Sequence, residues 1–157
     1  MRLLVLAIGA PRDPHMASLI RDYETRAGRY FRFEALEVTA TAGGGDSAEQ
    51  VRAREAESLR KRLPAGLKTW ALTRDGTEAS SRDLADMLSS MATYSHPGVA
   101  FLIGGAFGLD EVLVRECSRR ISLSRMTLPH DMARLVLAEQ IYRAGTIARG
   151  QPYHKGG

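Results

Sequence analysis

The glycine-rich segment Gly104–Gly108 (GGAFG) directly follows Val99–Ile103, the most apolar run of the chain. Ligands of α/β proteins bind outside the carboxyl ends of strands, and glycine lets a backbone approach a ligand closely. The segment therefore predicts a ligand-contacting turn, although a tight strand-to-helix turn would have the same composition. Its spacing differs from the GxGxxG dinucleotide fingerprint, and it lacks the Lys-Ser/Thr pair of a P-loop.

A second candidate is Ser122–Asp131 (SLSRMTLPHD), in which small and hydroxylic residues precede a proline. Proline is favoured in the first turn of a helix, so Pro129 indicates the start of a long helix. Such a loop can present backbone N–H and C=O groups to the edge of an adenine while leucine and methionine cover the ring. An ordinary connection between a strand and a helix would look alike, and the residues alone leave both interpretations open.

The C-terminal tail places Tyr153, His154 and Lys155 side by side. Aromatic rings can stack on an unpaired base and an ammonium group can meet a phosphate, although chain termini usually fray. His130 and Arg143 belong to the preceding predicted helix, about 3.6 turns apart, so they do not closely share one face. A common site for them would require the tail or a second subunit.

Several other chemistries find no support in the residue patterns. There is no HxxxH, CxxC or DxD cluster for a metal and no GxSxG nucleophile elbow. The single cysteine, Cys117, excludes an internal disulfide and a cysteine zinc site. We interpret it as a partly buried, small apolar residue.

The elements that must position these residues alternate between strand and helix. The predicted strands are Leu3–Ile8, Phe33–Val38, Lys68–Thr73, Val99–Ile103 and Ile121–Leu123. Helices are predicted from Pro14 to about Tyr30, from Ser47 to about Leu63, through Leu84–Met91, over about Asp110–Cys117, and from Pro129. This order predicts one α/β domain with a mostly parallel sheet.

Local signals sharpen three of these boundaries. Ser47 with Gln50 and Ser80 with Asp83 have the spacing of capping boxes at helix starts. Thr39–Asp46 is predicted to be a mobile loop, and Arg74–Gly76 a turn that ends the third strand.

Length and charge limit the partners. The chain has 157 residues, enough for one domain with its own core, and a net charge of +4 that favours nucleic acid as a partner. No run approaches the ~20 apolar residues of a membrane span, and Leu3–Ile8 is shorter than the apolar part of a signal peptide. We therefore expect a cytoplasmic protein without a membrane partner.

The segments LIGGAFG, SLSRMTLPHDMARLVLAEQIYRA and the terminal PYHK occur in this order. Together they resemble the ribosomal RNA large-subunit methyltransferase H family of the SPOUT class, and the resemblance covers residues 1–157 as a single SPOUT domain. It implies an α/β fold with a trefoil knot near the C-terminus and a homodimer. It also implies methyl transfer from S-adenosyl-L-methionine to N3 of a pseudouridine in 23S rRNA, on the assembled ribosome.

The resemblance also implies site residues. The cofactor contacts fall on Leu72, Gly104, Leu123, Ser124, Arg125, Met126, Thr127 and Leu128, with no metal. The catalytic, RNA-facing candidates are His130, Arg143, Tyr153, His154 and Lys155. Some relatives carry arginine at the Lys155 position, and lysine lacks the planar fork that makes bidentate contacts.

Three alternatives remain at this stage. A non-catalytic ribosome-associated RNA-binding protein would use the same basic surface without the cofactor contacts. A SPOUT enzyme acting on tRNA would need an added RNA-binding domain, for which the chain has no room. A flavodoxin-like protein would carry its phosphate loop after the first strand, where this chain has GAPRD.

Overall fold

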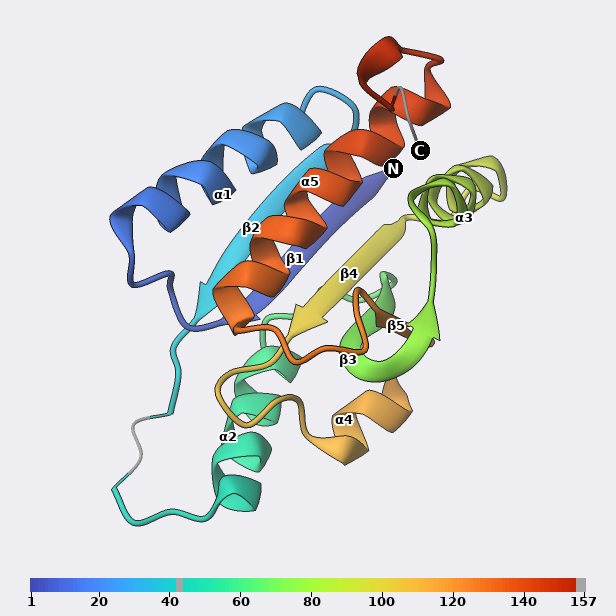
Figure 1. Ribbon diagram of the computed structural model, residues 1–157. Helices are drawn as coiled ribbons and strands as arrows, with labels where there is room; N and C mark the ends of the chain where they lie inside the picture. The colour runs from blue at the N-terminus through green and yellow to red at the C-terminus, as the bar shows by residue number, and fades with distance from the viewer. Residues whose placement is uncertain (42–43, 155–157) are drawn as a thin grey trace.

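The computed structural model describes residues 1–41 and 44–154, and within them five parallel strands form one sheet (Figure 1). The strand order is β2-β1-β4-β3-β5. The strands are β1 (Arg2–Ile8), β2 (Arg32–Val38), β3 (Lys68–Glu78), β4 (Gly98–Ile103) and β5 (Arg119–Ser122). Every pairing is parallel, so all five carboxyl ends lie along one edge of the sheet.

Helices cover both faces of this sheet. They are α1 (Pro14–Ala27), α2 (Ala48–Arg60), α3 (Ser81–Thr93), α4 (Glu111–Glu116) and α5 (His130–Ala148), followed by the 3₁₀ turn η1 (Pro152–His154). Leu3, Val5 and Ala7 of β1 pack in one core cluster with α1, α3 and α5. Leu4 and Leu6 pack in a second cluster with α2 and α4. Because successive side chains of a strand point to opposite faces, a continuous apolar run serves both cores.

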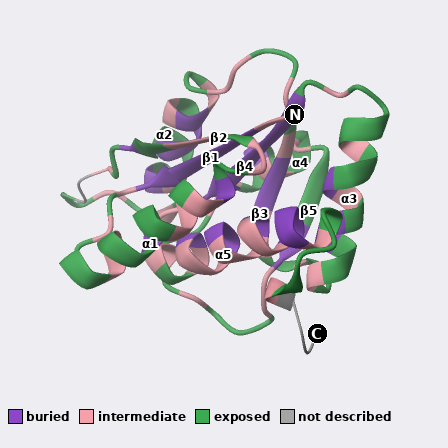
Figure 2. Cartoon of the chain, turned by 90° about the horizontal axis from the view of Figure 1, so that it is seen from above, coloured by how far each residue is buried: buried purple, intermediate pink, exposed green. Residues whose placement is uncertain are grey.

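Figure 2 shows buried residues concentrated in β1 and β4, as the apolar runs predict. The predicted α/β class with a parallel sheet is confirmed. Among the described residues, no helix combines the length and the apolar character that a membrane span requires.

The predicted helix starts are confirmed in detail. Both capping boxes form: Ser47 accepts from the N–H of Gln50, and Ser80 accepts from the N–H of Asp83. The first two helices end three residues earlier than predicted, at Ala27 and Arg60. The Thr39–Asp46 loop is present where the structure describes it, and residues 42–43 lie outside the described residues.

The prediction that the third strand ends at Thr73 is wrong. Leu72 and Thr77 both pair with Ile121 of β5, so the intervening residues form an irregular bulge and the strand resumes to Glu78. Gly76 lies so close to β5 that a Cβ atom there would approach the carbonyl carbon of Ile121 to 2.7 Å. The turn chemistry of Arg74–Gly76 is therefore used for a bulge inside the strand.

Helix α5 is fastened to α1 and β2 by a buried arginine. The Arg134 side chain, only 7% exposed, donates from Nε to Glu24 at 2.8 Å and from Nη1 to Glu37 at 2.7 Å. Burial lowers the pKa of Arg134, but the two carboxylates together raise it by a larger amount. The net pKa lies above its ordinary value, so the guanidinium stays charged. This network fixes the half of α5 that begins at His130.

Cys117 is half-buried, as predicted, and its thiol donates to the carbonyl of Leu113 at 3.3 Å. Burial raises the pKa of this thiol, which disfavours the nucleophilic thiolate. Its environment is that of a packing residue.

Candidate functional site

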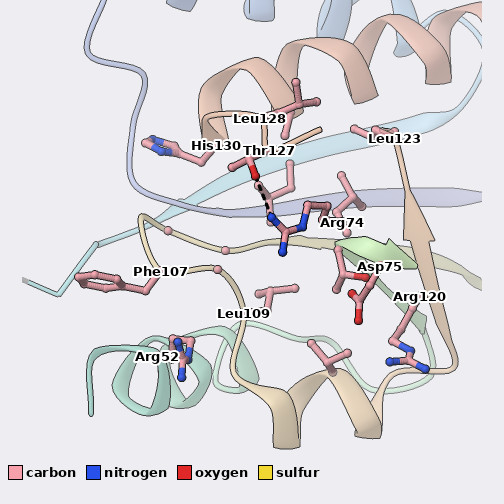
Figure 3. Close-up of a pocket in the computed structure, with 18 of the residues that line it drawn as sticks. Arg52, Arg74, Asp75, Phe107, Leu109, Arg120, Leu123, Thr127, Leu128 and His130 are labelled. Carbon is pink, nitrogen blue, oxygen red and sulfur yellow. Dashed lines mark hydrogen bonds between the residues drawn. The ribbon is translucent and has the colours of Figure 1, made fainter. Parts of the chain in front are cut away.

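A cavity of about 860 Å³ opens at the carboxyl edge of β3, β4 and β5 (Figure 3). Seven of the eight residues predicted to contact the cofactor line it: Leu72, Gly104, Leu123, Ser124, Met126, Thr127 and Leu128. The eighth, Arg125, has its side chain 86% exposed and 4.0 Å from Glu78, and it is not among the lining residues. Three segments far apart in sequence therefore meet around one cavity.

The parallel sheet brings these segments together. Because β3, β4 and β5 are neighbours, the bulge of β3 and the loops after β4 and β5 all reach the same edge. The bulge directs Thr73, Arg74 and Asp75 to the cavity. The hydroxyl of Ser122 donates to the carbonyl of Arg74 at 3.0 Å, which ties the bulge to β5.

The Gly104–Gly108 turn is closed so tightly that two of its glycines leave no room for a side chain. A Cβ atom at Gly104 would lie 2.6 Å from the backbone nitrogen of Leu109. One at Gly105 would lie 3.0 Å from both carboxylate oxygens of Glu55. The Gly108 N–H donates to the Gly105 carbonyl at 3.0 Å, and this bond completes the turn. The glycines thus serve backbone packing beside the cavity.

The loop after β5 is fixed from two sides. The Met126 N–H donates to Ser124 Oγ at 3.0 Å, and Arg74 Nη1 donates to Thr127 Oγ1 at 3.1 Å (Figure 3). Pro129 caps α5 without a side-chain hydrogen bond. Backbone groups of Leu123–Leu128 are therefore held at the cavity wall.

The lining has the chemistry that an adenosyl group requires. Apolar side chains such as Leu72, Ile103 and Leu128 provide a surface for a flat ring. Two buried polar atoms at the cavity have no hydrogen-bond partner among the described residues, Thr73 Oγ1 and His130 Nε2. Unpaired buried polar groups are costly, so Thr73 Oγ1 is a candidate partner for a ligand. His130 Nε2 lies beside Gly9, 3.5 Å from where a Cβ atom of that residue would be.

Glu55 is a site residue that sequence reasoning missed. It lies on α2, is 4% exposed, and accepts from the Thr41 N–H at 3.3 Å while its carboxylate packs against Gly105. Burial raises the pKa of the Glu55 carboxyl group. The backbone N–H groups of Thr41 and Gly105 and the nearby His130 lower this pKa, but by less than burial raises it. One carboxylate thus joins the loop after β2 to the glycine turn.

The predicted RNA-facing residues divide into two groups. His130 lines the cavity at the start of α5. Arg143 and Tyr153 lie together near the end of the helix, about 20 Å away at 1.5 Å per residue. The backbone of His154 belongs to η1, and Lys155 lies outside the described residues.

Glu139, which sequence analysis left without a role, organises the second group. Its Oε1 accepts from Arg143 Nη2 at 2.6 Å and from the Tyr153 hydroxyl at 3.1 Å. The Arg143 guanidinium lies 4.9 Å from the centre of the Tyr153 ring, whose centre is 4.6 Å from that of Tyr142. The tail is therefore held to α5 by this cluster.

The electrostatics of this cluster restrict its chemistry. Burial and the neighbouring Glu139 carboxylate raise the pKa of Tyr153 well above its ordinary value, so its hydroxyl stays protonated. The hydrogen bond to Glu139 raises the pKa of Arg143 as well. Tyr153 is thus a hydrogen-bond donor and a ring surface, and the charge of Arg143 is partly compensated.

The family model described as "Predicted SPOUT methyltransferase" matches residues 1–154, so the protein belongs to the SPOUT methyltransferases, and its parallel sheet with a cavity at the carboxyl edge agrees with that class. Ribosomal RNA large subunit methyltransferase H of Gemmatimonas aurantiaca is 47% identical over 99% of this chain and all of its own length. The protein of that name from Anaeromyxobacter is 42% identical over the same shares. The chain belongs to the ribosomal RNA large subunit methyltransferase H family.

Solved structures agree on the fold. The probable methyltransferase of Bordetella pertussis matches with a TM-score of 0.57, covering 91% of this chain and 94% of its own, at 17% identity. A putative methylase family protein of Neisseria gonorrhoeae matches with a TM-score of 0.51 over 90% and 80%, at 19% identity.

Proposed function

We propose that the protein transfers a methyl group from S-adenosyl-L-methionine to N3 of a pseudouridine in 23S rRNA, in the cytoplasm and on the assembled ribosome. The observation that carries the proposal is the meeting of Leu72, Gly104 and the Leu123–Leu128 segment around one cavity. The names of relatives that match over their whole length support rRNA as the substrate. Residues 1–157 act as one SPOUT domain in this proposal.

The cofactor is held by the cavity wall. Leu72, Ile103 and Leu128 would cover the adenine ring, and backbone groups of Leu123–Leu128 would meet its polar edge. Thr73 Oγ1, which has no hydrogen-bond partner among the described residues, would supply a hydrogen bond to the cofactor. When bound, S-adenosyl-L-methionine supplies an electrophilic methyl group on a sulfonium centre.

The attacking atom belongs to the RNA, so the protein's task is alignment. Holding two reactants in line contributes roughly 7–11 kcal/mol to lowering the barrier. In this proposal Tyr153 positions the target base with its ring. The N3 proton passes either to the imidazole of His130 or His154, or to water while the positive charges of Arg143 and Lys155 stabilise the N3 anion. Tyr153 is not the base, because its raised pKa keeps the hydroxyl protonated.

The separation of the two groups supports a homodimer, which is part of the proposal. Within one chain, the cavity and the Arg143–Tyr153 cluster occupy opposite ends of α5. We propose that the tail of one subunit completes the cavity of its partner. A site built in this way needs two copies of the chain.

The proposal includes a trefoil knot near the C-terminus. The path of the chain supports it: β5 lies at an edge of the sheet, whereas α5 packs in the core that contains β1 and β4 (Figure 1). Residues 123–129 therefore cross back over the carboxyl edge before α5 begins.

Two measurements test the proposed function. Calorimetry with S-adenosyl-homocysteine should show binding, and mass spectrometry of 23S rRNA fragments should show one methyl group fewer in cells lacking the gene. Naked 23S rRNA should be a poorer substrate than ribosomes. A protein that ignores the cofactor analogue but binds ribosomes would instead be a non-catalytic RNA-binding protein.

A further inference from the structure

Four arginines surround the cavity, counted over the described residues. Arg52 comes from α2, Arg74 from the bulge of β3, Arg115 from α4 and Arg120 from β5. Figure 3 shows Arg52, Arg74 and Arg120 reaching the same opening from different sides. We call these four residues the arginine rim.

Among the described residues, the four arginines of the rim lack ionic partners, as do seven of the fifteen other arginines. No ion pair to any of the four forms within residues 1–41 and 44–154. By contrast, eight other arginines are paired: Arg2, Arg26, Arg32, Arg54, Arg60, Arg125, Arg134 and Arg143. Within the described part of the chain, the Arg74 side chain donates only to the neutral hydroxyl of Thr127. The rim therefore gathers uncompensated charge at the cavity.

The methyl donor cannot balance this charge. Two carboxylates, Asp75 and Glu111, line the cavity against four arginines, which leaves a formal excess of two positive charges. The donor carries a sulfonium, an ammonium and one carboxylate, so its own net charge is positive. An anionic partner other than the donor is needed to favour the filled site.

We infer that the arginine rim binds phosphates of the RNA chain on either side of the nucleotide that enters the cavity. The inference rests on the proposed function and names the part of the protein that holds its substrate. Each guanidinium offers a planar fork that matches two phosphate oxygens. Because the four side chains come from separate elements, the rim follows the cavity's edge and can track a backbone.

The test compares R52A, R120A and their combination with the matched control R62A. Arg62 is exposed just beyond the C-terminal end of α2, far along that helix from Arg52. Three quantities are measured: S-adenosyl-homocysteine affinity, KM for ribosomes from cells lacking the gene, and affinity for a fluorescein-labelled 23S rRNA fragment. The last two are measured over a range of KCl concentrations.

We expect unchanged analogue affinity and thermal midpoint in every variant. The double variant should raise KM for ribosomes about tenfold and lower the salt dependence of RNA binding by about one unit of slope for each arginine removed. R62A should match the wild type.

Three results would overturn the inference. Loss of analogue affinity with unchanged KM would assign the arginines to the donor's carboxylate. An equal effect in R62A would indicate a nonspecific charge effect, and no effect in any variant would remove the rim from RNA binding. If the wild type methylates no RNA, the proposed function fails, and the labelled fragment still decides whether the rim binds phosphate.

Discussion

Tyr153 combines a ring and a hydroxyl whose roles can be separated. Its ring packs on Tyr142 and under Arg143, and its hydroxyl donates to Glu139. We predict that Y153A lowers the rate of rRNA methylation at least tenfold, because the base loses a stacking contact worth about 1–3 kcal/mol. The affinity for S-adenosyl-homocysteine should stay within twofold of the wild-type value. Methylation kinetics and calorimetry measure the two effects.

The matched control is Y153F, which keeps the ring and removes only the hydroxyl. It should retain more activity than Y153A. The difference between Y153F and Y153A measures the contribution of the ring, and the difference between wild type and Y153F measures the hydrogen bond to Glu139. Parallel loss of methylation and analogue binding in Y153A would contradict the assignment of Tyr153 to the RNA side.

A second prediction for a single residue concerns Gly104, in the turn beside the proposed cofactor site. A Cβ atom there would lie 2.6 Å from the nitrogen of Leu109, so G104A must open the turn beside the cavity. We predict that S-adenosyl-homocysteine affinity falls at least tenfold (about 1.4 kcal/mol). Gly44 provides the control, since a Cβ at that position meets none of the described atoms within 4 Å. Wild-type affinity in G104A would contradict the role of the turn.

At the scale of elements, local sequence determined most of the fold. Apolar runs located the strands, and the Ser47 and Ser80 boxes located two helix starts, because both signals depend on neighbours in the chain. The continuation of β3 beyond Thr73 could not be predicted, because Arg74–Gly76 contains the Asp-Gly pair that is typical of turns. The pairings of Thr77 with Ile121 and of Glu78 with Ser122, which are distant in sequence, keep that segment in the sheet.

The attachment of α5 gives an element-scale prediction. R134M should lower the free energy of unfolding by about 3 kcal/mol, because it leaves the Glu24 carboxylate, 13% exposed, without its partner. Urea denaturation measures the loss, and adding E24Q should restore part of it. R125M is the control: its partner Glu78 lies 4.0 Å away at the surface, so the change should stay below about 0.5 kcal/mol. Equal losses in both variants would contradict the anchoring role.

Glu55 connects three elements and gives a pH-dependent prediction. Burial raises its pKa in the folded state, so the folded protein holds this proton more tightly than the unfolded chain does. Its contribution to stability is therefore greatest at acidic pH and declines as pH rises from the ordinary glutamate pKa through the raised one. Urea denaturation between pH 4 and 8 should show wild type losing stability relative to E55Q over that interval.

The exposed Glu57 on the same helix supplies the control variant, E57Q. If the difference in stability between wild type and E57Q changes with pH in the same way as that between wild type and E55Q, the effect does not come from the buried carboxylate. A constant difference between wild type and E55Q would contradict the raised pKa.

At the scale of the whole molecule, the meeting of the proposed cofactor residues was more predictable than the arrangement of the proposed RNA-facing residues. Gly104 and Leu123–Leu128 follow strands and Leu72 directly precedes the bulge of β3, and the parallel sheet brings these segments to one edge. The pairing of Glu139 with Arg143 and Tyr153 depends on how the tail folds back onto α5. Strand order and tail path are set by long-range packing, which no local pattern encodes.

The separation of the two groups along α5 makes the dimer testable by mixing two inactive variants. G104A has a defective cavity and an intact tail, whereas Y153A has an intact cavity and a defective tail. If each tail serves the partner's cavity, a mixed dimer contains one intact site, formed by the cavity of the Y153A subunit and the tail of the G104A subunit. If each tail serves its own cavity, both sites of the mixed dimer are defective.

Equimolar mixing after unfolding and refolding makes half of the dimers mixed, each with one working site of two. Activity should therefore return to about a quarter of the wild-type value per subunit, provided that the subunits of the two variants pair at random. Sedimentation verifies that each variant alone is dimeric, and methylation of ribosomes is the readout. Activity that stays at the level of the separate variants would mean that the tail acts within its own subunit, and that α5 must bend or the tail must move to bridge about 20 Å.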